Sequence, residues 1–437
     1  MQKSLNHTST HSRQISDYPT AMNGTNARIG IIFSHFRHLR GEGGGLERNR
    51  WNLALEYLRR GHPVDVLALS EDGINNIPMH PQLCVYPLSS AGMLQTRFSC
   101  IKSTPDYWRE LLKPVILPLK GARTLTKVPS IAKYFNTAQP DLVIGGGTQE
   151  NLAILLARRR ARSAAKVLVS QHNPLSNTLH SPKHKKRWRW RYLPPLLRKL
   201  YLEADAIVGI SKSVANDVER TLSLPHGAVK VIYNPVVDES LWGRLADDIS
   251  HPWLTDRRAP VVLSVGRMTR QKDHATLIRG FAKARERKTM RLLIIGDGPE
   301  RQALQDLAIS LGVQGDIDMP GFKANPLPYM AHADVFALTS RWEGFGNVLV
   351  EAMAADCPII CSDCPGGPRE VVDDGRFGTL IPVGNAEAVA ESLLNVLNND
   401  RKRKSTKDRA SLFSVSRAAT AYLEEVGLTT AQEDRPI

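Results

Sequence analysis

Cysteines are few in this sequence, and long apolar runs are absent. Five cysteines in 437 residues are a small and odd number, which favours a reducing compartment over a disulfide framework. No stretch of about 18 consecutive apolar residues occurs, and this absence argues against a membrane-spanning helix. The first 27 residues are polar without an apolar core, so they are expected to form a flexible tail and not a signal peptide. The expected location is the cytoplasm.

Metal-binding motifs are also lacking. Cys357, Cys361 and Cys364 lie in the segment CPIICSDCPGGP, where an apolar strand runs into a turn, and no second ligand pair accompanies them. Asp316 and Asp318 have the D-x-D spacing of metal-dependent transferases, but they stand at an ordinary step from a loop to a strand. The sequence therefore predicts no metal site.

Acidic residues are in the minority. The chain has 58 Lys and Arg against 43 Asp and Glu, which gives a formal charge of +15 and a pI of about 9.7. Such a basic protein is expected to bind anions, whether nucleotides, phosphorylated substrates, nucleic acid or an acidic membrane surface. With 42% hydrophobic residues, a chain of 437 residues is long enough for two domains that each bury a core.

Short apolar runs alternate with helical patterns along most of the chain. The run RIGIIFSH is followed by the loop LRGEGGG and then by LERNRWNLALEYLRRG, where Trp51, Leu55 and Leu58 recur at helical spacing. Gly61 supplies a C-terminal stop for this helix. The next run, PVDVLALS, completes a β-α-β unit with glycines at its turn, which is where a doubly wound sheet binds ligands.

This alternation pauses once and then begins again. Strands are predicted at residues 28–35, 63–70, 140–147, 166–173, 204–213, 260–268, 291–299, 333–340 and 357–368. A polar, proline-containing stretch at about 236 to 258 separates the two series and is the expected hinge. The sequence thus predicts an α/β protein with two Rossmann-like domains facing a central cleft. Its predicted divisions are a tail at 1–27, domains at 28–236 and 237–425, and a tail at 426–437.

Two glutamates flank a glycine-containing turn in the second series. The segment EGFGNVLVEAMAADCP places Glu343 in the loop after a predicted strand and Glu351 on the helix that follows. The N-terminal end of that helix offers free amides and the positive end of a dipole, which favour an anion. Because a carboxylate can accept from two hydroxyls, the pair suits a ligand with hydroxyls on either side of a phosphate, such as a nucleotide sugar.

This segment resembles the E-x7-E motif of the retaining glycosyltransferases of glycosyltransferase family 4 (glycosyl transferases group 1), which have the GT-B architecture of two Rossmann-like domains. Further segments resemble the family in the same order, over roughly residues 28–425: GGGLERNRWNLALEYLRRGHPVDV, SQHN, AIVGISKSVANDV, VIYNPVV, SVGRMTRQKDHATLIRGF and IIGDGPERQAL. The resemblance implies a hexosyltransferase whose first domain binds a glycan acceptor and whose second binds a nucleotide diphosphate sugar. A UDP-sugar is the expected donor of a hexose or N-acetylhexosamine.

The resemblance also implies roles for individual residues. Arg267 and Lys272 would neutralise the diphosphate as the sugar leaves, because without a metal or cofactor fixed cations and helix-end amides must stabilise that charge. Glu351 would bind the ribose hydroxyls, Glu343 would lie beside the transferred sugar, and His172 would contact that sugar. Retention is compatible with front-face internal return, which needs no nucleophile, and with double displacement, which needs one.

Two glycine-containing loops complete the implied site. In the first domain, Gly43, Gly44 and Gly45 would let the backbone approach the phosphate or the acceptor. The implied catalytic residues are His172, Arg267, Lys272 and Glu343. The implied donor-binding residues are Gly44, Gly45, Arg267, Lys272, Glu343, Gly344, Phe345, Gly346, Asn347 and Glu351.

One position departs from the family pattern. Asp356 stands where the family usually has glycine, just after the helix that carries Glu351. Aspartate tolerates the left-handed conformation at some cost, so the helix end is expected to be slightly weaker with no loss of chemistry.

Three other functions have partial support. An NAD-dependent dehydrogenase would use Glu71 or Asp72 as its ribose-binding acid, but the turn GEGGGLE lacks G-x-G-x-x-G spacing. A sugar phosphorylase of the same architecture would need a lysine for pyridoxal phosphate, and no distinctive site is apparent. A nucleic-acid binder is suggested by the charge and by SPKHKKRWRWRYLPPLLRKLY. The family resemblance explains more of the sequence, so no nucleic-acid partner is expected.

The same basic stretch suggests a membrane partner. Between residues 183 and 199, eight cations are interleaved with Trp188, Trp190 and Tyr192, a composition that suits an anionic bilayer surface. The alternative is a solvated loop that is merely rich in charge. The sequence predicts that this segment holds the enzyme peripherally at the inner face of the cell membrane, where it glycosylates a lipid-linked intermediate of cell-envelope polysaccharide synthesis.

Overall fold

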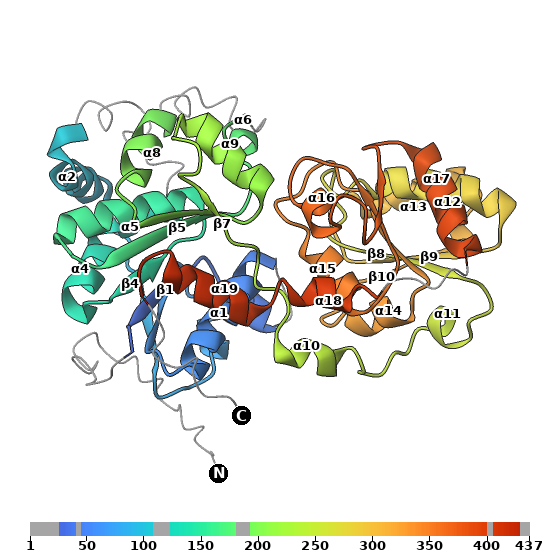
Figure 1. Cartoon of the computed structure of the whole chain (residues 1–437), viewed down its shortest axis with the longest axis horizontal. Coiled ribbons are helices and arrows are strands. Elements are labelled where there is room, and N and C mark those ends of the chain that lie inside the picture. The colour runs from blue at the N-terminus through green and yellow to red at the C-terminus, as the bar shows by residue number, and fades with distance from the viewer. Residues whose placement is uncertain (1–25, 41–44, 108–122, 181–192, 400–404, 429–437) are drawn as a thin grey trace, which may run out of the picture.

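Two parallel β-sheets with helices packed against them form the described part of the chain, which in this computed structural model comprises residues 26–40, 45–107, 123–180, 193–399 and 405–428 (Figure 1). Among these residues the first sheet has the strand order β3-β2-β1-β4-β5-β6-β7, and the second has the order β10-β9-β8-β11-β12-β13. The strand order reverses between β1 and β4 and between β8 and β11. Such switch points are where doubly wound sheets bind ligands. The predicted fold class is confirmed.

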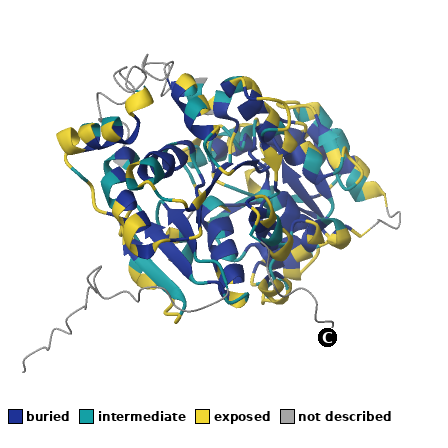
Figure 2. Ribbon diagram, turned by 60° about the vertical axis from the view of Figure 1, so that its left-hand side comes forward, coloured by how far each residue is buried: buried dark blue, intermediate teal, exposed yellow. Residues whose placement is uncertain are grey.

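The strands of the first sheet are β1 (Ile29–Phe33), β2 (Val64–Ala68), β3 (Leu83–Pro87), β4 (Leu142–Ile144), β5 (Lys166–Gln171), β6 (Ala206–Gly209) and β7 (Lys230–Val231). Those of the second sheet are β8 (Val261–Val265), β9 (Arg291–Ile295), β10 (Ile317–Gly321), β11 (Val335–Leu338), β12 (Ile359–Ser362) and β13 (Thr379–Ile381). The central strands are buried on both faces, which is why they read as continuous apolar runs in the sequence (Figure 2).

Helices of the first half are α1 (Gly45–Arg59), α2 (Met93–Ser103), α4 (Val128–Ala138), α5 (Thr148–Ala161), α6 (Leu175–His180), α8 (Leu193–Tyr201) and α9 (Lys212–Leu222). The linking segment carries α10 (Glu239–Arg244) and α11 (Pro252–Thr255). The rest of the chain forms α12 (His274–Arg287), α13 (Arg301–Ser310), α14 (Leu327–His332), α15 (Asn347–Ala354), α16 (Pro368–Val371), α17 (Ala386–Asn398), α18 (Lys407–Ser411) and α19 (Val415–Glu424). We call the two sheets with their helices the N-terminal and C-terminal domains.

Two crossings between the domains lie within the described residues, and they pair with each other. The amides of Val236 and Val237 both donate to the carbonyl of Phe413 at 3.1 Å, and the amide of Val415 donates to the carbonyl of Val237 at 2.8 Å. The predicted hinge at 236–258 is therefore shorter in the structure, because the segment beyond Val237 packs along the C-terminal domain. One such contact is the hydrogen bond between His251 Nε2 and Asp318 Oδ2 at 3.0 Å.

The second crossing corrects the predicted division of the chain at residue 425. Helix α19 returns to the N-terminal domain, where Ala419, Tyr422 and Leu423 are buried in one cluster with side chains of β1 and α1. Val426 belongs to the same cluster and Leu428 packs against it, so residues 426–428 are not part of a tail, while the rest of the predicted tail at 426–437 lies outside the described residues. The reason is that an amphipathic C-terminal helix can bury its apolar face against α1 without regard to sequence order.

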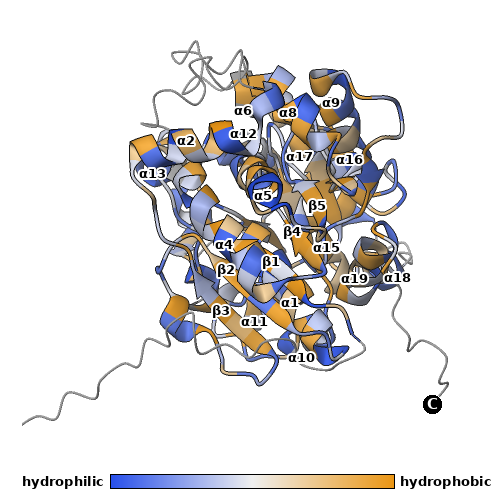
Figure 3. Cartoon of the chain, turned by 90° about the vertical axis from the view of Figure 1, so that its left-hand side faces the viewer, coloured by the Kyte–Doolittle hydropathy of each residue, from blue (hydrophilic) through white to orange (hydrophobic). Residues whose placement is uncertain are grey.

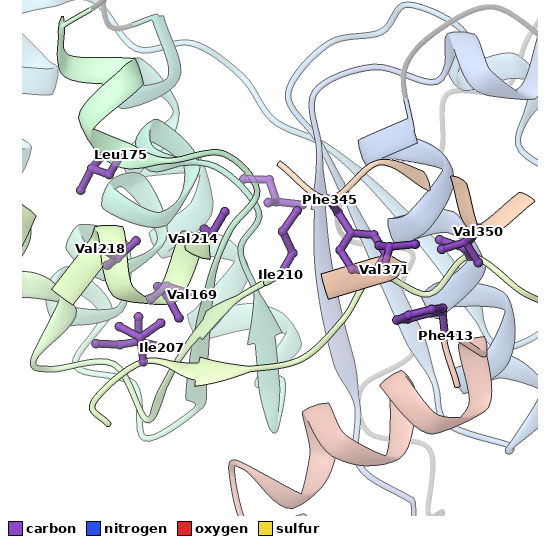
Figure 4. Close-up of a cluster of buried hydrophobic side chains, with 14 of the residues drawn as sticks. Val169, Leu175, Ile207, Ile210, Val214, Val218, Phe345, Val350, Val371 and Phe413 are labelled. Carbon is purple, nitrogen blue, oxygen red and sulfur yellow. The ribbon is translucent and has the colours of Figure 1, made fainter. Parts of the chain in front are cut away.

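Aromatic packing fills the junction between the domains. The rings of Tyr233, Phe345 and Phe413 pack against one another, and their centroids are 5.4 to 5.6 Å apart. From the N-terminal domain, Ile210 points toward Phe345 (Figure 4). The hydrophobic core is thus continuous across the junction and does not end at the surface of each sheet.

Asp356 has the left-handed conformation predicted for it, with φ of 55°. Its carboxylate also has partners that the sequence did not indicate, because Oδ1 accepts from the amide of Thr406 at 2.8 Å. The hydroxyl of Thr406 in turn donates to the carbonyl of Met353 at 2.8 Å. The C-terminal end of α15 is therefore bonded to the residue that precedes α18.

Replacing Phe413 with alanine tests the importance of the aromatic junction. The ring is 2% exposed, so its removal leaves a cavity and should lower the free energy of unfolding by about 3 to 5 kcal/mol. Denaturant titration of Phe413→Ala against wild type measures the difference. Phe322→Ala is the control, because that side chain is 51% exposed and little packing is lost. Equal effects of the two substitutions would contradict this role of the junction.

Candidate active site

Two adjacent strands of the C-terminal domain bring Lys272 and Glu343 together. These residues lie in the loops that follow β8 and β11, which pair in parallel at the switch point. Lys272 Nζ lies 2.6 Å from Glu343 Oε1, and Ser340 Oγ donates to the same oxygen at 2.6 Å. The two charged side chains are only 15% and 8% exposed, so the cation is held in a fixed position by a largely buried carboxylate.

Helix α15 begins at the turn that the sequence singled out. Gly346 precedes the helix with φ of 94°, a conformation that favours glycine, and no side chain caps the first turn. The uncapped amides and the helix dipole favour an anion at this end. Further along the helix Glu351 is 8% exposed, and Arg48 Nη1 of α1 lies 3.4 Å from its Oε1.

The first residues of α1 and α15 meet across the domain junction. A Cβ atom on Gly45 would lie 2.7 Å from Asn347 Nδ2, so only glycine fits there without a shift. Asn347 donates to Asn49 Oδ1 at 3.0 Å and accepts from Asn234 Nδ2 at 2.8 Å. Two helix N-termini therefore lie in contact, and their positive ends favour a multiply charged anion such as a diphosphate.

His172 follows β5 and faces the same junction. Gly344 lies so close that a Cβ atom on it would be 2.1 Å from the carbonyl oxygen of His172. The structure therefore brings the predicted sugar-contacting histidine against the loop that carries Glu343.

Hydrogen bonding fixes the tautomer of His172. Ser170 Oγ donates its single proton to the carbonyl of Gly145 at 2.9 Å, so it can only accept from His172 Nε2 at 2.8 Å. Nε2 then carries the ring proton, and Nδ1 is left as an acceptor with no partner among the described residues. Burial, together with the nearby charge of Arg50, lowers the pKa of His172 to about 3. The ring is therefore neutral at physiological pH.

Three of the other predicted residues need separate comment. Arg267 is exposed in the loop after β8, and its side chain makes no hydrogen bond or ion pair within the described part of the chain. The ring of Phe345 is 2% exposed in the junction, so a donor contact could involve only its backbone. Gly44, together with Gly43, lies outside the described residues, as do residues 181–192 of the basic segment.

A buried charge cluster that the sequence did not indicate lies at the switch point of the N-terminal sheet. Arg50 Nη2 lies 2.5 Å from Glu150 Oε2, and Arg50 Nη1 also donates to the carbonyl of Ile32 at 2.9 Å. Ser34 Oγ donates to Glu150 Oε1 at 2.5 Å, and burial raises the pKa of nearby Glu47. The signal that could have found it is the segment LERNR directly after the glycine loop, which also supplies Arg48.

The acids of the metal and dehydrogenase alternatives are engaged elsewhere. Asp316 pairs with Arg285 Nε at 2.9 Å, and Asp72 pairs with Arg37 in a neighbouring loop. Within the described ranges no group of three or more His, Cys, Asp or Glu side chains could hold a metal ion. In the same part of the chain, none of the helices combines the length and the hydropathy that a membrane span requires.

Two Rossmann-like domains with helix ends and fixed charges between them define a GT-B protein. Comparison with known families then identifies the family. Residues 43–240 match the family described as Glycosyltransferase Family 4, and residues 247–412 match the one described as Glycosyl transferases group 1. Together the two matches cover most of the chain, which therefore belongs to the glycosyltransferases that these two descriptions name.

Among curated relatives, one from Campylobacter jejuni is named N-acetylgalactosamine-N,N'-diacetylbacillosaminyl-diphospho-undecaprenol 4-alpha-N-acetylgalactosaminyltransferase. It is 34% identical over 235 residues, which cover 52% of this chain and 62% of the relative. The lipopolysaccharide core biosynthesis glycosyltransferase LpsE of Rhizobium meliloti is 34% identical over 175 residues, covering 39% of this chain and 50% of LpsE. The chain thus spans 50% to 62% of the length of these relatives, which is less than two thirds.

Solved structures share the fold over nearly the whole chain. Anabaena HepE in complex with UDP and glucose superposes with a TM-score of 0.67 at 19% identity, covering 91% of this chain and 99% of HepE. Sucrose-phosphate synthase from Thermosynechococcus elongatus superposes with a TM-score of 0.70 at 19% identity, covering 91% of this chain and 98% of the synthase. The GT-B fold is therefore confirmed by comparison.

The lowered pKa of His172 predicts a loss of stability in acid. Its folded pKa is about 3 and the ordinary value is 6.5, so between these values the unfolded chain binds a proton that the folded chain does not. Above pH 6.5 the stability that depends on the neutral His172 ring is fully present. Below pH 6.5, protonation of the unfolded chain lowers the free energy of unfolding by up to about 1.4 kcal/mol per pH unit. Denaturant titrations from pH 7 to pH 4 should give a shallower slope for His172→Asn than for wild type.

His80→Asn is the matched control, since the His80 ring is exposed on the surface. It shows how far the loss of any histidine alters the slope, and the alteration should be larger for His172→Asn. The same slope for His172→Asn and wild type would contradict a lowered pKa of His172 in the folded protein.

Proposed function

We propose that this chain transfers a hexose or N-acetylhexosamine from a UDP-sugar to a lipid-linked glycan acceptor, with retention of configuration. The observation that carries the proposal is the meeting of α1 and α15 at Gly45 and Asn347, with Glu343 in the turn before α15 and Glu351 on the helix itself. A diphosphate placed there would face two helix N-termini.

On the donor side, Lys272 and Arg267 would stabilise the leaving diphosphate. The Lys272 ammonium has three donors, so it can remain bonded to Glu343 at 2.6 Å and still donate to a phosphate oxygen. Arg267 lies on the same loop and has no competing partner among the described residues, so its guanidinium is available for a bidentate contact. Charge that grows on the leaving group as the glycosyl bond breaks would then meet preorganised cations and amides.

Glu351 would hold the ribose. One of its carboxylate oxygens has a long contact of 3.4 Å with Arg48, which leaves capacity for two sugar hydroxyls. Because Arg48 belongs to the N-terminal domain, binding of the nucleotide at Glu351 is linked to the position of α1.

His172 and Glu343 would bind the transferred sugar. With its proton on Nε2, His172 offers Nδ1 as an acceptor for a sugar hydroxyl and adds no charge to the site. Gly344 closely approaches the backbone of His172, so His172 lies next to the loop that carries Glu343, and hydroxyls on the donor sugar could bond to both side chains.

The acceptor proposal is supported by the relatives and by charge. The Campylobacter relative is named for an acceptor carried on diphospho-undecaprenol, and LpsE is named for lipopolysaccharide core biosynthesis. HepE was crystallised with UDP and glucose, which supports UDP-sugars as donors in this fold. A formal charge of +15 suits an acceptor that is held at an anionic membrane, as predicted for the segment 183–199.

Substitutions in the donor site should separate binding from transfer. Glu351→Ala should mainly raise the KM or Kd for the donor, because ribose contacts exist in both the ground state and the transition state. Arg267→Ala and Lys272→Ala should mainly lower kcat, each by a barrier increase of roughly 2 to 4 kcal/mol. Hydrolysis rates across a panel of UDP-, GDP- and ADP-sugars, followed by kinetics on the best donor, provide the measurement.

Arg270→Ala is the control for this series, since Arg270 is an exposed cation of the same loop to which no role is assigned. If all three site variants kept the wild-type kcat/KM, the donor site would lie elsewhere. A best donor outside the UDP-sugars would contradict the nucleotide assignment alone.

Nucleotide binding should also close the two domains further. The donor residues and His172 lie on opposite sides of a junction that the described residues cross at 236–237 and 413–415, so a ligand between them should draw the domains together. Small-angle scattering should show a smaller radius of gyration with saturating UDP. An unchanged radius at saturation would contradict closure.

A further inference from the structure

In addition to the basic segment 183–199, the N-terminal domain has a concentration of positive charge on the side that faces away from the C-terminal domain (Figures 1 and 3). Helices α2, α4 and α5 enclose a cleft of about 560 Å³ there. Five of the eight residues that line it are cations and none is an acid: Lys102, Lys133, Arg159, Arg160 and Arg162. We call this feature the cationic cleft.

Only one of these five cations is neutralised. Arg159 lies 2.6 Å from Glu203 and 2.9 Å from Asp106. The side chains of the other four make no ion pair or hydrogen bond within the described part of the chain. Four unpaired like charges around one hollow repel one another, and an anion in the hollow would relieve that repulsion. The charge in the cleft is therefore suited to a phosphate group.

An exposed apolar stripe leads from α2 into the cationic cleft. Leu94, Phe98 and Lys102 are spaced four residues apart and so lie on the same face of α2. Leu94 is 68% exposed and Phe98 is 73% exposed. Two large apolar side chains beside a cationic hollow are what an interfacial helix presents to a lipid headgroup layer.

The end of the basic segment 183–199 lies beside the same cleft. Lys199 Nζ of α8 lies 4.8 Å from the centre of the Tyr107 ring, and the guanidinium of Arg159 lies 4.9 Å from it. The described end of that segment and the cationic cleft are thus joined through one aromatic ring. They form a continuous basic surface with the stripe on α2 at its edge.

We propose that the cationic cleft and α2 form a membrane-docking surface that takes the phosphate headgroup of an anionic phospholipid. The phosphate would enter among Lys102, Lys133, Arg160 and Arg162, while Leu94 and Phe98 would insert into the headgroup layer. This goes beyond the proposed glycosyl transfer, since the surface shares no residue with the donor site. It assigns an orientation in which the C-terminal domain projects away from the bilayer and stays free to move.

Vesicle flotation of the full chain tests this surface. Wild type should float at low salt with vesicles of phosphatidylglycerol and phosphatidylcholine, and not with phosphatidylcholine alone. Lys133→Gln/Arg160→Gln/Arg162→Gln should reduce binding at least about tenfold, because it removes three of the cations that face the anionic surface. Leu94→Ser/Phe98→Ser should also reduce vesicle binding. Its effect should be larger on the binding that remains at high salt than on the binding that high salt abolishes.

Arg279→Gln/Lys283→Gln/Arg287→Gln on α12 is the matched control, since it removes the same charge from exposed positions of the other domain. It should float like wild type. Equal losses for the control and the cleft variant would overturn the proposal in favour of net charge alone. Failure of wild type to float, with inorganic phosphate binding measured by calorimetry, would overturn it in favour of a soluble phosphate ligand.

The docking surface and the donor site can be tested separately. UDP binding by the cleft variant should equal that of wild type, and circular dichroism should show an unchanged fold. Normal flotation of Glu351→Ala, together with weak UDP binding, would support the docking surface as independent of the donor site. Loss of vesicle binding by Glu351→Ala would overturn that independence.

Discussion

The contact between the first turns of α1 and α15 determines how the two domains face each other. Asn347 bonds to Asn49 and Asn234, and Gly45 leaves room for its amide group. The contact holds two positive helix ends close together, which is unfavourable unless something negative lies near them. Glu351, whose carboxylate lies 3.4 Å from Arg48 of α1, supplies negative charge between the two helices. A nucleotide diphosphate would supply further negative charge at the same place.

The two crossings give this arrangement its geometry. Because Val236 and Val237 bond to Phe413, the strands that connect the domains behave as one short ribbon and not as two independent linkers. The aromatic cluster of Tyr233, Phe345 and Phe413 packs around this ribbon. Relative motion of the domains is therefore confined to bending of a packed ribbon, which preserves the register between the loop at Gly344 and the strand end at His172.

Local patterns predicted most of the fold, because the central strands are buried on both faces and read as apolar runs. Strands β3, β7, β10 and β13 were missed, because each lies at the edge of its sheet and none is buried along its whole length. The E-x7-E spacing located Glu343 and Glu351 on the loop and helix where they are found. Contacts between distant segments, such as Arg48 with Glu351 or Asn234 with Asn347, depend on tertiary packing and leave no periodic signal. The return of α19 to the first domain escaped prediction for the same reason.

The aspartate at the end of α15 has a mechanical consequence. Asp356 and Met353 both bond to Thr406, which immediately precedes α18, and α18 leads within two residues to Phe413 in the second crossing. Helix α15 is thus fastened at its C-terminal end to the chain that forms the ribbon, while its N-terminal end faces the anion site. A tilt of this helix must displace the ribbon as well. With glycine at position 356, as is usual in the family, the carboxylate part of this connection would be absent and the helix could pivot more independently.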